Sequence, residues 1–425
     1  MNEEQFLLNV SLVKDKMILI LIVGHLCMQP RAQKEAKLLR HAGANVAIRC
    51  TWFSDGMAAE DRDIANRIGV EVEPVIDLRR RTISTIILRM RQRFARECYA
   101  RFGWVTARAF GLGSPEFLRE ARVHNADLTI LHSESGLWVA EKLLADGRRV
   151  GFDMLDWFSQ DLPPVDRKER PVGAMQVLER HLLRRAHFCL TTTHVLAEAL
   201  EKDAGTTRLP VVVPNCFPAS ERQMVQHVQR CSKLGEAVTF HWFSQTIGPW
   251  RGLETLAQAL PLLRGEWVLT LRGNLGGNQK WFADTFPANL RDRIQLLAPV
   301  SNAELLAYTI PHDIGLALEV QYCPSRDLTA TNKIFEYLRA GLAVIASQTR
   351  GQEEVMKACP NAGMLVEPDD PVALAYAMQK MLDDAEYLSN CRRFSAEAGG
   401  TVWSWETHSP KLLNAVADAL AIPLP

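Results

Sequence analysis

The sequence predicts an α/β protein built from two doubly wound parallel-sheet domains, and three observations support this fold class. The chain has 425 residues, a length typical of two domains that each bury a core. Hydrophobic residues make up 47% and charged residues 23%, as in ordinary globular proteins. Strand-like apolar runs alternate with stretches of helical periodicity in both halves, which is typical of parallel sheets covered by helices.

The first half begins with an apolar run over 17–23 that ends at Gly24. A helical pattern over 31–41 and a second strand over 46–48 complete a βαβ unit. The following βα units are predicted as strands over 128–131, 149–152 and 188–191, with helices over 136–145 and 177–185. Turn residues after 211–213 lead us to expect a first domain over 1–215 and a linker over 216–235.

The second half repeats this architecture without repeating the sequence. Strands are predicted over 238–243, 267–271, 294–297, 314–318 and 343–346, and helices over 253–263, 303–308 and 333–340. We therefore expect a second domain over 236–400, followed by a terminal segment over 401–425.

Charge and cysteine content exclude several classes of protein. The chain has 49 basic and 49 acidic residues, whereas a nucleic-acid-coating protein needs a basic excess. Its nine cysteines include no CxxC pair, so neither a disulfide framework nor a zinc site is expected and a reducing cytoplasm fits best. The run over 17–23 is too short to cross a bilayer.

Ligands of open parallel sheets bind beyond the carboxyl ends of the strands. The loop after strand 238–243 contains Ser244, Thr246 and Arg251 just before a helix. Helix amides and a nearby arginine favour an anion such as a diphosphate. An ordinary turn with a surface arginine is the alternative interpretation. Asn274, in the glycine-containing loop after strand 267–271, is a weaker candidate.

A helix predicted to begin near Asn332 carries Lys333 and Glu336 on one face, because the two residues are three apart. The cation suits a phosphate, and the carboxylate could accept hydrogen bonds from both hydroxyls of a ribose. A solvated intrahelical ion pair between the two side chains is the alternative.

These segments and others in the same order resemble the family 4 group of retaining glycosyltransferases, the glycosyl transferases group 1. The resemblance covers nearly the whole chain. It rests on Pro30-Arg31, Glu35-Ala36, Val213-Pro214-Asn215, Arg251-Gly252, Asn332-Lys333-Ile334-Phe335-Glu336-Tyr337, Gly363-Met364-Leu365-Val366-Glu367-Pro368 and Trp403-Ser404-Trp405-Glu406.

The resemblance implies a GT-B fold, in which two Rossmann-like domains face each other across a cleft. It implies a nucleotide-sugar donor, UDP- or GDP-linked, held mainly by the C-terminal domain, with no separate cofactor and no metal. Arg251 and Lys333 would meet the diphosphate and Glu336 the ribose, while Gly24 would lie close to the donor. The final helix after Trp405 would return to the N-terminal domain.

Three positions depart from the family pattern. Leu328 stands where a first glutamate is usual, Gln245 or Thr246 replaces an arginine, and Asp153-Met154-Leu155-Asp156 carries Leu155 in place of a histidine. Asp156, which ends that segment, is retained as a catalytic candidate. These departures leave open a non-catalytic GT-B subunit that supports another transferase, and an epimerase-like GT-B enzyme.

Two further positions concern the first domain. His132 follows the strand over 128–131 and is expected to contact the acceptor. Asp61-Arg62-Asp63 matches the metal-binding Asp-x-Asp pattern of another glycosyltransferase architecture, but it lies in a polar helical stretch, so we expect a solvated surface.

The segment over 79–108 contains nine arginines and one acid, Glu97, among large apolar residues. This composition is typical of a basic amphipathic segment on an anionic membrane surface; a solvated helix near the acceptor site is the alternative. We expect a cytoplasmic transferase, peripheral at the inner face of the membrane if the segment docks there. Its acceptor would be a glycan or a lipid-linked glycan in surface polysaccharide assembly.

Overall fold

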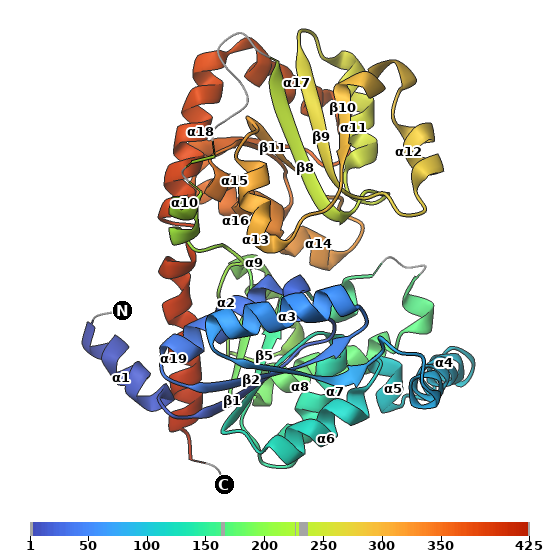
Figure 1. Cartoon of the computed structure of the whole chain (residues 1–425), viewed down its shortest axis with the longest axis vertical. Coiled ribbons are helices and arrows are strands. Elements are labelled where there is room, and N and C mark those ends of the chain that lie inside the picture. Colours follow the sequence, from blue (N-terminus) through green and yellow to red (C-terminus); the bar gives the residue numbers. More distant parts are fainter. Residues whose placement is uncertain (1–2, 163–165, 226, 229–236, 424–425) are drawn as a thin grey trace. The chain divides into compact units, whose positions relative to one another are not determined.

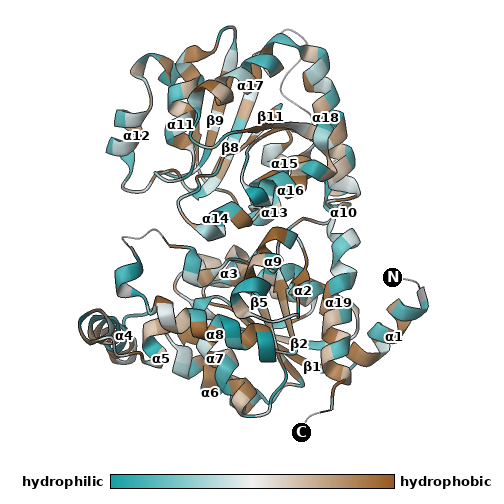
Figure 2. Cartoon of the chain, turned by 180° about the vertical axis from the view of Figure 1, so that it is seen from behind, coloured by the Kyte–Doolittle hydropathy of each residue, from teal (hydrophilic) through white to brown (hydrophobic). Residues whose placement is uncertain are grey.

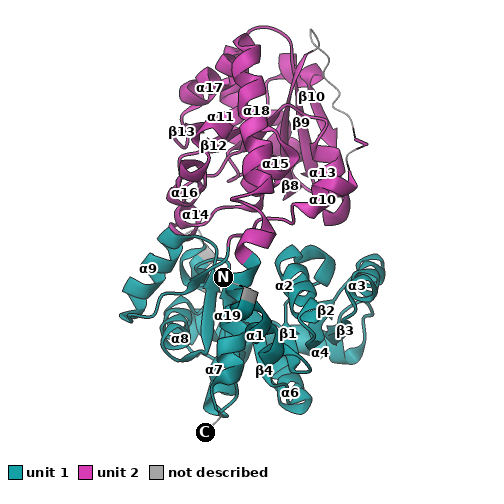
Figure 3. Cartoon of the chain, turned by 90° about the vertical axis from the view of Figure 1, so that its left-hand side faces the viewer, with its two compact units in different colours: residues 1–213, 409–425 teal, residues 214–408 magenta. Residues whose placement is uncertain are grey.

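The structure, a computed structural model, describes residues 3–162, 166–225, 227–228 and 237–423. The chain divides into two compact units, shown in separate colours in Figure 3. Unit 1 comprises Met1–Val213 together with Ser409–Pro425, and unit 2 comprises Pro214–His408. The expected linker over 216–235 includes residue 226 and residues 229–235, which lie outside the described residues.

Unit 1 is built on a parallel seven-stranded sheet with the order β3-β2-β1-β4-β5-β6-β7. Its strands β1, β2 and β5 are labelled in Figure 1. Its helices follow the strands in βα alternation. The strands are β1 Met17–Leu21, β2 Asn45–Trp52, β3 Glu71–Asp77, β4 Leu128–His132, β5 Val150–Met154, β6 Phe188–Thr191 and β7 Val211–Val212. The helices are α1 Glu3–Val13, α2 Pro30–His41, α3 Asp55–Ile68, α4 Ile83–Phe102, α5 Ala107–Phe110, α6 Ser114–His124, α7 Glu134–Ala145, α8 Val172–Arg185 and α9 His194–Ala204, with short 3-10 turns η1 Leu26–Met28, η2 Phe158–Gln160 and η3 Asp166–Glu169.

Unit 2 contains a parallel six-stranded sheet with the order β10-β9-β8-β11-β12-β13. The strands are β8 Val238–Thr246, β9 Trp267–Asn274, β10 Ile294–Leu297, β11 Ile314–Ala317, β12 Ala343–Ser347 and β13 Gly363–Val366. The helices are α10 Ser220–Met224, α11 Leu253–Ala259, α12 Gln279–Thr285, α13 Asn302–Thr309, α14 Pro324–Leu328, α15 Asn332–Ala340, α16 Arg350–Ala358, α17 Pro371–Asp383 and α18 Ala385–Gly400, with 3-10 turns η4 Leu260–Leu262, η5 Ala288–Arg293 and η6 Pro360–Ala362.

The last helix, α19 (Trp405–Ala421), begins in unit 2, and its residues from Ser409 onward belong to unit 1. There it meets the first helix, because the Asn9 amide of α1 donates a hydrogen bond to Asn414 of α19. No described helix combines the length and the apolar character needed to cross a membrane.

The predicted fold class is confirmed, since both halves form parallel sheets with helical connections. Several predicted bounds differ from those of the structure; for example, the helix expected over 177–185 begins at Val172. The helix expected over 253–263 ends at Ala259 and continues as a 3-10 turn that contains Pro261, because proline cannot donate the backbone hydrogen bond that an α-helix interior requires. The first strand also ends at Leu21, two residues before its predicted limit.

The central strands are buried on both faces, as expected for a sheet that is covered by helices on both sides. Every residue of β11 and β12 is buried, and the sheets are predominantly hydrophobic in Figure 2. Packing is tight at Gly315 in β11, where an added Cβ would lie 2.2 Å from the ring of buried Tyr337. Glycine is therefore required there by the close approach of α15.

We predict that Gly315→Ala lowers the free energy of unfolding by roughly 1–3 kcal/mol, the usual cost of overpacking a core. Urea denaturation measures this change. Gly56→Ala is the matched control, because an added Cβ there meets no atom within 4 Å and the residue lies in α3. Equal stability of the two variants would contradict the packing argument.

Candidate functional site

Both sheets reverse their strand order at one place, between β1 and β4 in unit 1 and between β8 and β11 in unit 2. Ligands of doubly wound sheets bind outside the carboxyl ends of the strands at such a reversal. In unit 1, Gly24 lies in the loop after β1, and His132 is the last residue of β4. In unit 2, residues 244–251 form the end of β8 and the loop after it, and Glu319 lies in the loop after β11. The topology therefore places most of the predicted site residues at the two expected edges.

In unit 2, Lys333 forms a buried ion pair that was not predicted. Its Nζ lies 2.6 Å from Oε1 of Glu319, and the Thr331 hydroxyl donates to the same oxygen at 3.0 Å. Burial alone would raise the pKa of Glu319, but the adjacent Lys333 outweighs burial and lowers it. Glu319 is therefore held as a carboxylate against the Nζ of Lys333. The available sequence signal for Glu319 was an acid directly after the strand predicted over 314–318.

Arg251 lies in a loop that is packed closely against the end of β11. Its guanidinium donates to the Ser244 hydroxyl at 2.9 Å. Gly252 has φ +73°, and an added Cβ would lie 2.7 Å from Cβ of Leu318. Trp250 has φ 64°, a backbone conformation that is strained for a bulky residue. The loop thus holds Arg251 in a defined place, beside the strand that leads to Glu319.

The neighbouring loop residues mainly shape the backbone. Thr246 ends β8 and pairs with Asn274 in β9. The side chain of Asn274 accepts a hydrogen bond from Gly276 N at 2.8 Å, which closes its own turn. Asn278 donates to the carbonyl of Ile247 at 2.9 Å and ties the two loops together.

Lys333 and Glu336 do not form the pair that was the alternative interpretation of their spacing. Glu336 pairs with Arg339, and Arg339 also pairs with Glu221 and lies over the Phe217 ring. That alternative is wrong, because each side chain has a different charged partner. The predicted contact of Glu336 with a ribose stays a prediction.

Two other predicted positions are engaged within unit 2. Asn332, at the start of α15, accepts a hydrogen bond from the amide of Asn215. Leu328, the position of the missing family glutamate, is a buried core residue, and its neighbour Asp327 pairs with Arg350 at 2.6 Å. Leu328 has no carboxylate, and that of Asp327 is already paired, so neither residue replaces the family glutamate with a free carboxylate.

In unit 1, His132 belongs to a buried cluster of four ionisable side chains. Arg31 Nε lies 2.9 Å from Glu35 and 2.8 Å from Asp153. His132 Nε2 lies 3.0 Å from Glu35 Oε2, an ion-pair distance without good hydrogen-bond geometry, and its Nδ1 lies 3.7 Å from Asp153. Burial disfavours the charged form of His132, but the carboxylate of Glu35 outweighs burial and raises its pKa. Burial likewise opposes ionisation of Glu35, whose pKa His132 and Arg31 nevertheless lower to about 2.

His132 also lines a small pocket at the strand reversal of unit 1, together with Ile22, Val23 and Ser133. Ser133 has φ 70° and ψ 166°, a combination that is strained for any residue except glycine and that clusters at functional sites. Gly24 has φ +93°, and an added Cβ would meet no atom within 4 Å. The loop after β1 therefore leaves open space, as a close approach to a ligand requires.

Asp156 follows β5 and is half-buried. Neighbouring Ser159 is held by Glu179, which accepts hydrogen bonds from the Ser159 amide at 3.0 Å and from its hydroxyl at 2.5 Å. Asp156 itself makes no hydrogen bond or ion pair with another residue in the described part of the chain. Its carboxylate is therefore the one in this loop that is left for a ligand.

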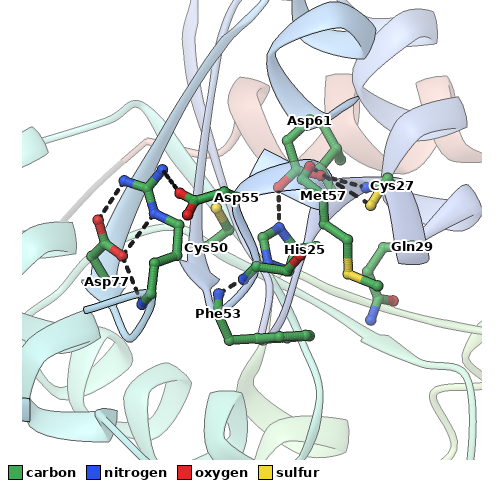
Figure 4. Close-up of polar contacts among 12 residues, drawn as sticks. His25, Cys27, Gln29, Cys50, Phe53, Asp55, Met57, Asp61 and Asp77 are labelled. Carbon is green, nitrogen blue, oxygen red and sulfur yellow. Dashed lines mark hydrogen bonds and ion pairs between the residues drawn. The ribbon is translucent and has the colours of Figure 1, made fainter. Parts of the chain in front are cut away.

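The prediction that Asp61 lies on a solvated surface is wrong. Asp61 is fully buried, accepts a hydrogen bond from His25 Nδ1 at 2.7 Å and another from Cys27 N at 2.7 Å (Figure 4). His25 Nε2 accepts hydrogen bonds from the backbone N–H of Phe53 at 2.9 Å and from that of Ser54 at 3.2 Å. Asp61 thus anchors the loop that follows Gly24. Asp63, by contrast, is exposed as expected.

Two groups of potential metal ligands are brought together by the fold, although none was apparent in the sequence: His25, Cys27 and Asp61, and Glu35, His132 and Asp153. In the first, both nitrogens of His25 are engaged, and burial raises the pKa of the Cys27 thiol, which disfavours a thiolate ligand. In the second, the guanidinium of Arg31 already occupies the space between the two carboxylates. Neither group fits a divalent cation well.

We predict that His132 stabilises the fold most at acidic pH. A raised pKa contributes stability that is fully present below the unfolded value of about 6.5 and is lost as pH rises through the folded value. In urea denaturation, the destabilisation caused by His132→Gln should therefore be larger at pH 6 than at pH 9. His41→Gln, at an exposed position of α2, is the control. A pH-independent difference for His132→Gln would contradict the ion pair with Glu35.

Comparison with known proteins gives a match in unit 2. Residues 238–384 match the family model described as "Glycosyl transferases group 1". Over 92 residues, 22% of this chain, the sequence is 34% identical to a protein of Oryza sativa subsp. japonica named "Probable sucrose-phosphate synthase 5". The matched stretch spans 9% of the length of that relative.

Solved structures match nearly the whole chain at low identity. HepE of Anabaena, in complex with UDP-glucose, is 16% identical, with a TM-score of 0.65 and coverage of 95% of this chain and 99% of that one. WaaG, a glycosyltransferase involved in lipopolysaccharide biosynthesis, is 13% identical, with a TM-score of 0.60 and coverage of 96% and 100%. At these identities the likeness establishes the fold. The chain is therefore a GT-B-fold protein, and residues 238–384 of its second unit match the glycosyl transferases group 1 family model.

Proposed function

We propose that the protein is a glycosyltransferase that moves a sugar from a nucleotide-sugar donor to a glycan or lipid-linked glycan, with retention of configuration. One observation carries the proposal. Arg251 and the Lys333–Glu319 pair lie at the strand reversal of unit 2, within the residues that match the family model. A dinucleotide-type fold binds its ligand at this edge, and HepE is described in complex with UDP-glucose.

The donor diphosphate is assigned to the two cations of unit 2. Arg251 offers a planar guanidinium that suits bidentate contact with phosphate oxygens. Lys333 lies in the first turn of α15, where backbone amides and the helix dipole also favour an anion. Glu336, one turn further, is assigned to the ribose. UDP or GDP would satisfy these groups equally, because the diphosphate and the ribose are common to both.

Unit 1 is assigned to the acceptor. Gly24 leaves open space beyond β1, and Asp156 presents a carboxylate beyond β5. His132 is enclosed in the cluster with Arg31, so we assign it to positioning of this edge. A carboxylate and the departing diphosphate are both suited to deprotonating an acceptor hydroxyl.

The main catalytic task is stabilisation of the negative charge that develops on the departing diphosphate. In this proposal Arg251, Lys333 and the amides of α15 supply that stabilisation, and no metal ion is required. Retention follows if the diphosphate itself accepts the proton of the acceptor on the same face. The product would be a surface polysaccharide or another glycoconjugate, assembled in the cytoplasm.

We predict that Lys333→Ala and Glu336→Ala each weaken binding of UDP or GDP about ten- to a hundredfold, since a hydrogen bond to a charged group contributes about 1.5–3 kcal/mol. Isothermal titration calorimetry measures the affinity, and thermal unfolding checks that each variant is folded. Lys357→Ala, at an exposed site of α16, should bind like the native chain. Unchanged affinity in both folded variants would remove the donor assignment.

Donor hydrolysis should continue when divalent metals are chelated, because the charge on the diphosphate is balanced by side chains. The measurement is release of UDP or GDP from nucleotide-sugars with and without EDTA. Loss of activity that manganese or magnesium restores would overturn metal independence. Binding of a nucleotide-sugar without turnover under any condition would favour the non-catalytic GT-B subunit instead.

A further inference from the structure

Helix α4 carries large apolar side chains on its solvent side. Ile83, Ile87, Met90 and Phe94 follow one another at helical spacing and therefore form one stripe. Their side chains are 78%, 43%, 65% and 71% exposed. The helix lies at the periphery of unit 1, beside α5 (Figures 1 and 2), and it packs on α5 and η3.

The residues of α4 that are buried against unit 1 are small and lie toward the end of the helix. Ala95 and Cys98 are the buried residues of the helix. An ordinary surface helix buries its large apolar residues and exposes its polar ones. In α4 the four residues of the stripe are exposed, so packing within unit 1 does not explain them.

Arginines flank this stripe on both sides. At 100° per residue, Arg91 lies about 80° to one side of the stripe and Arg93 about 80° to the other side. Arg89 lies on the same side as Arg93, farther from the stripe. Arg89, Arg91 and Arg93 are exposed and form no ion pair with a described residue. Three other arginines of the segment, Arg79, Arg101 and Arg108, do pair with acidic residues. The stripe is therefore bordered by positive charge that no described acidic residue pairs with.

Two aromatic residues at the end of α4 and just after it, Phe102 and Trp104, are exposed as well. Phe102 and Trp104 are 62% and 63% exposed, and their ring centroids lie 5.2 Å apart. Tryptophan favours the boundary between water and hydrocarbon, because one part of its ring is apolar and the indole N–H can meet water.

We propose that α4 docks unit 1 on an anionic lipid surface, with the stripe Ile83, Ile87, Met90 and Phe94 in the headgroup and acyl boundary and Arg89, Arg91 and Arg93 at lipid phosphates. Amphipathic helices bind membranes in this way, lying in the plane of the interface. Electrostatic attraction of juxtamembrane arginines to anionic lipids adds to burial of the stripe.

Charge separates this occupant from the others that an apolar stripe could receive. A second copy of the chain would bring three further uncompensated arginines against the same face in a symmetric dimer, and like charges repel across an interface. A nucleic acid would pair with the arginines but would leave the aliphatic stripe without an apolar partner. An anionic bilayer supplies both an apolar layer and negative phosphates.

The docking inference does not depend on the transfer reaction. If both hold, α4 brings a transferase to the surface where a lipid-linked acceptor is presented. If the protein transfers no sugar, the stripe and its arginines still fit the same surface. The test therefore measures lipid binding separately from nucleotide binding.

The test is cosedimentation of the full chain with vesicles of equal parts phosphatidylglycerol and phosphatidylcholine, and with vesicles of phosphatidylcholine alone. The charge variant is Arg89→Gln/Arg91→Gln/Arg93→Gln. Its matched control is Arg67→Gln/Arg119→Gln/Arg393→Gln, which removes three exposed arginines away from α4. The apolar variant is Met90→Ser/Phe94→Ser.

The native chain and the control should bind the anionic vesicles at low salt and release them at high salt. The charge variant should partition on the order of 100-fold more weakly, since each arginine near the surface contributes about 1 kcal/mol. The apolar variant should also bind more weakly at equal charge. All variants should retain the native affinity for UDP and the native unfolding temperature.

Three results would overturn the inference: no binding of the native chain to anionic vesicles at low salt, equal binding by the native chain and the charge variant, or equal loss in the control. A concentration-dependent dimer that the apolar variant abolishes would assign the stripe to a second copy. Binding of single-stranded oligonucleotide in preference to vesicles would assign the arginines to nucleic acid. A native chain that binds anionic vesicles but does not bind UDP would count against the proposed function and would leave the docking inference standing.

Discussion

The guanidinium of Arg31 is the interaction on which the functional edge of unit 1 depends. It bonds Glu35 in its own helix, Asp153 at the end of β5 and the carbonyl of Val213, the last residue before unit 2. A buried charge is tolerated only when such partners replace its lost hydration, and removal of one partner is strongly destabilising. Arg31 therefore joins α2 to β5 and fixes the point where the chain leaves unit 1. Because Arg31 also pairs with the carboxylate of Asp153, Asp156 is the carboxylate that is left for a ligand beyond β5.

Unit 2 uses the same principle with a different outcome. Lys333 is balanced by Glu319, but it forms no cluster as extensive as that of Arg31. A single carboxylate neutralises the cation while no ligand is bound, and a diphosphate would bring a second anion within its reach. The Arg31 guanidinium is thus fully engaged in contacts within the protein, whereas in the function proposed above Lys333 would exchange Glu319 for a donor diphosphate.

The sheets could be predicted from the sequence because buried strands and covering helices differ in hydrophobic period, which is a local property. Contacts between residues that are distant in the sequence could not be predicted in this way. Glu319 lies fourteen residues before Lys333, and only the crossover from β11 to α15 brings them together. Asp61 was misplaced for a different reason. Its neighbours in α3 are polar, but Ala58 and Ala65, three and four residues away, are buried on the same face, a spacing that could have indicated burial.

Backbone strain shows why the two reversal loops are suited to binding. Ser133 directly follows His132, and Trp250 directly precedes Arg251; both have positive φ. Such conformations cost about 1–3 kcal/mol each and persist only where surrounding contacts enforce them. In unit 2 the enforcing contact is the close packing of Gly252 against Leu318. A loop already held in this way loses little further conformational entropy when an anion binds, so more of the proposed interaction between Arg251 and phosphate would be retained as affinity.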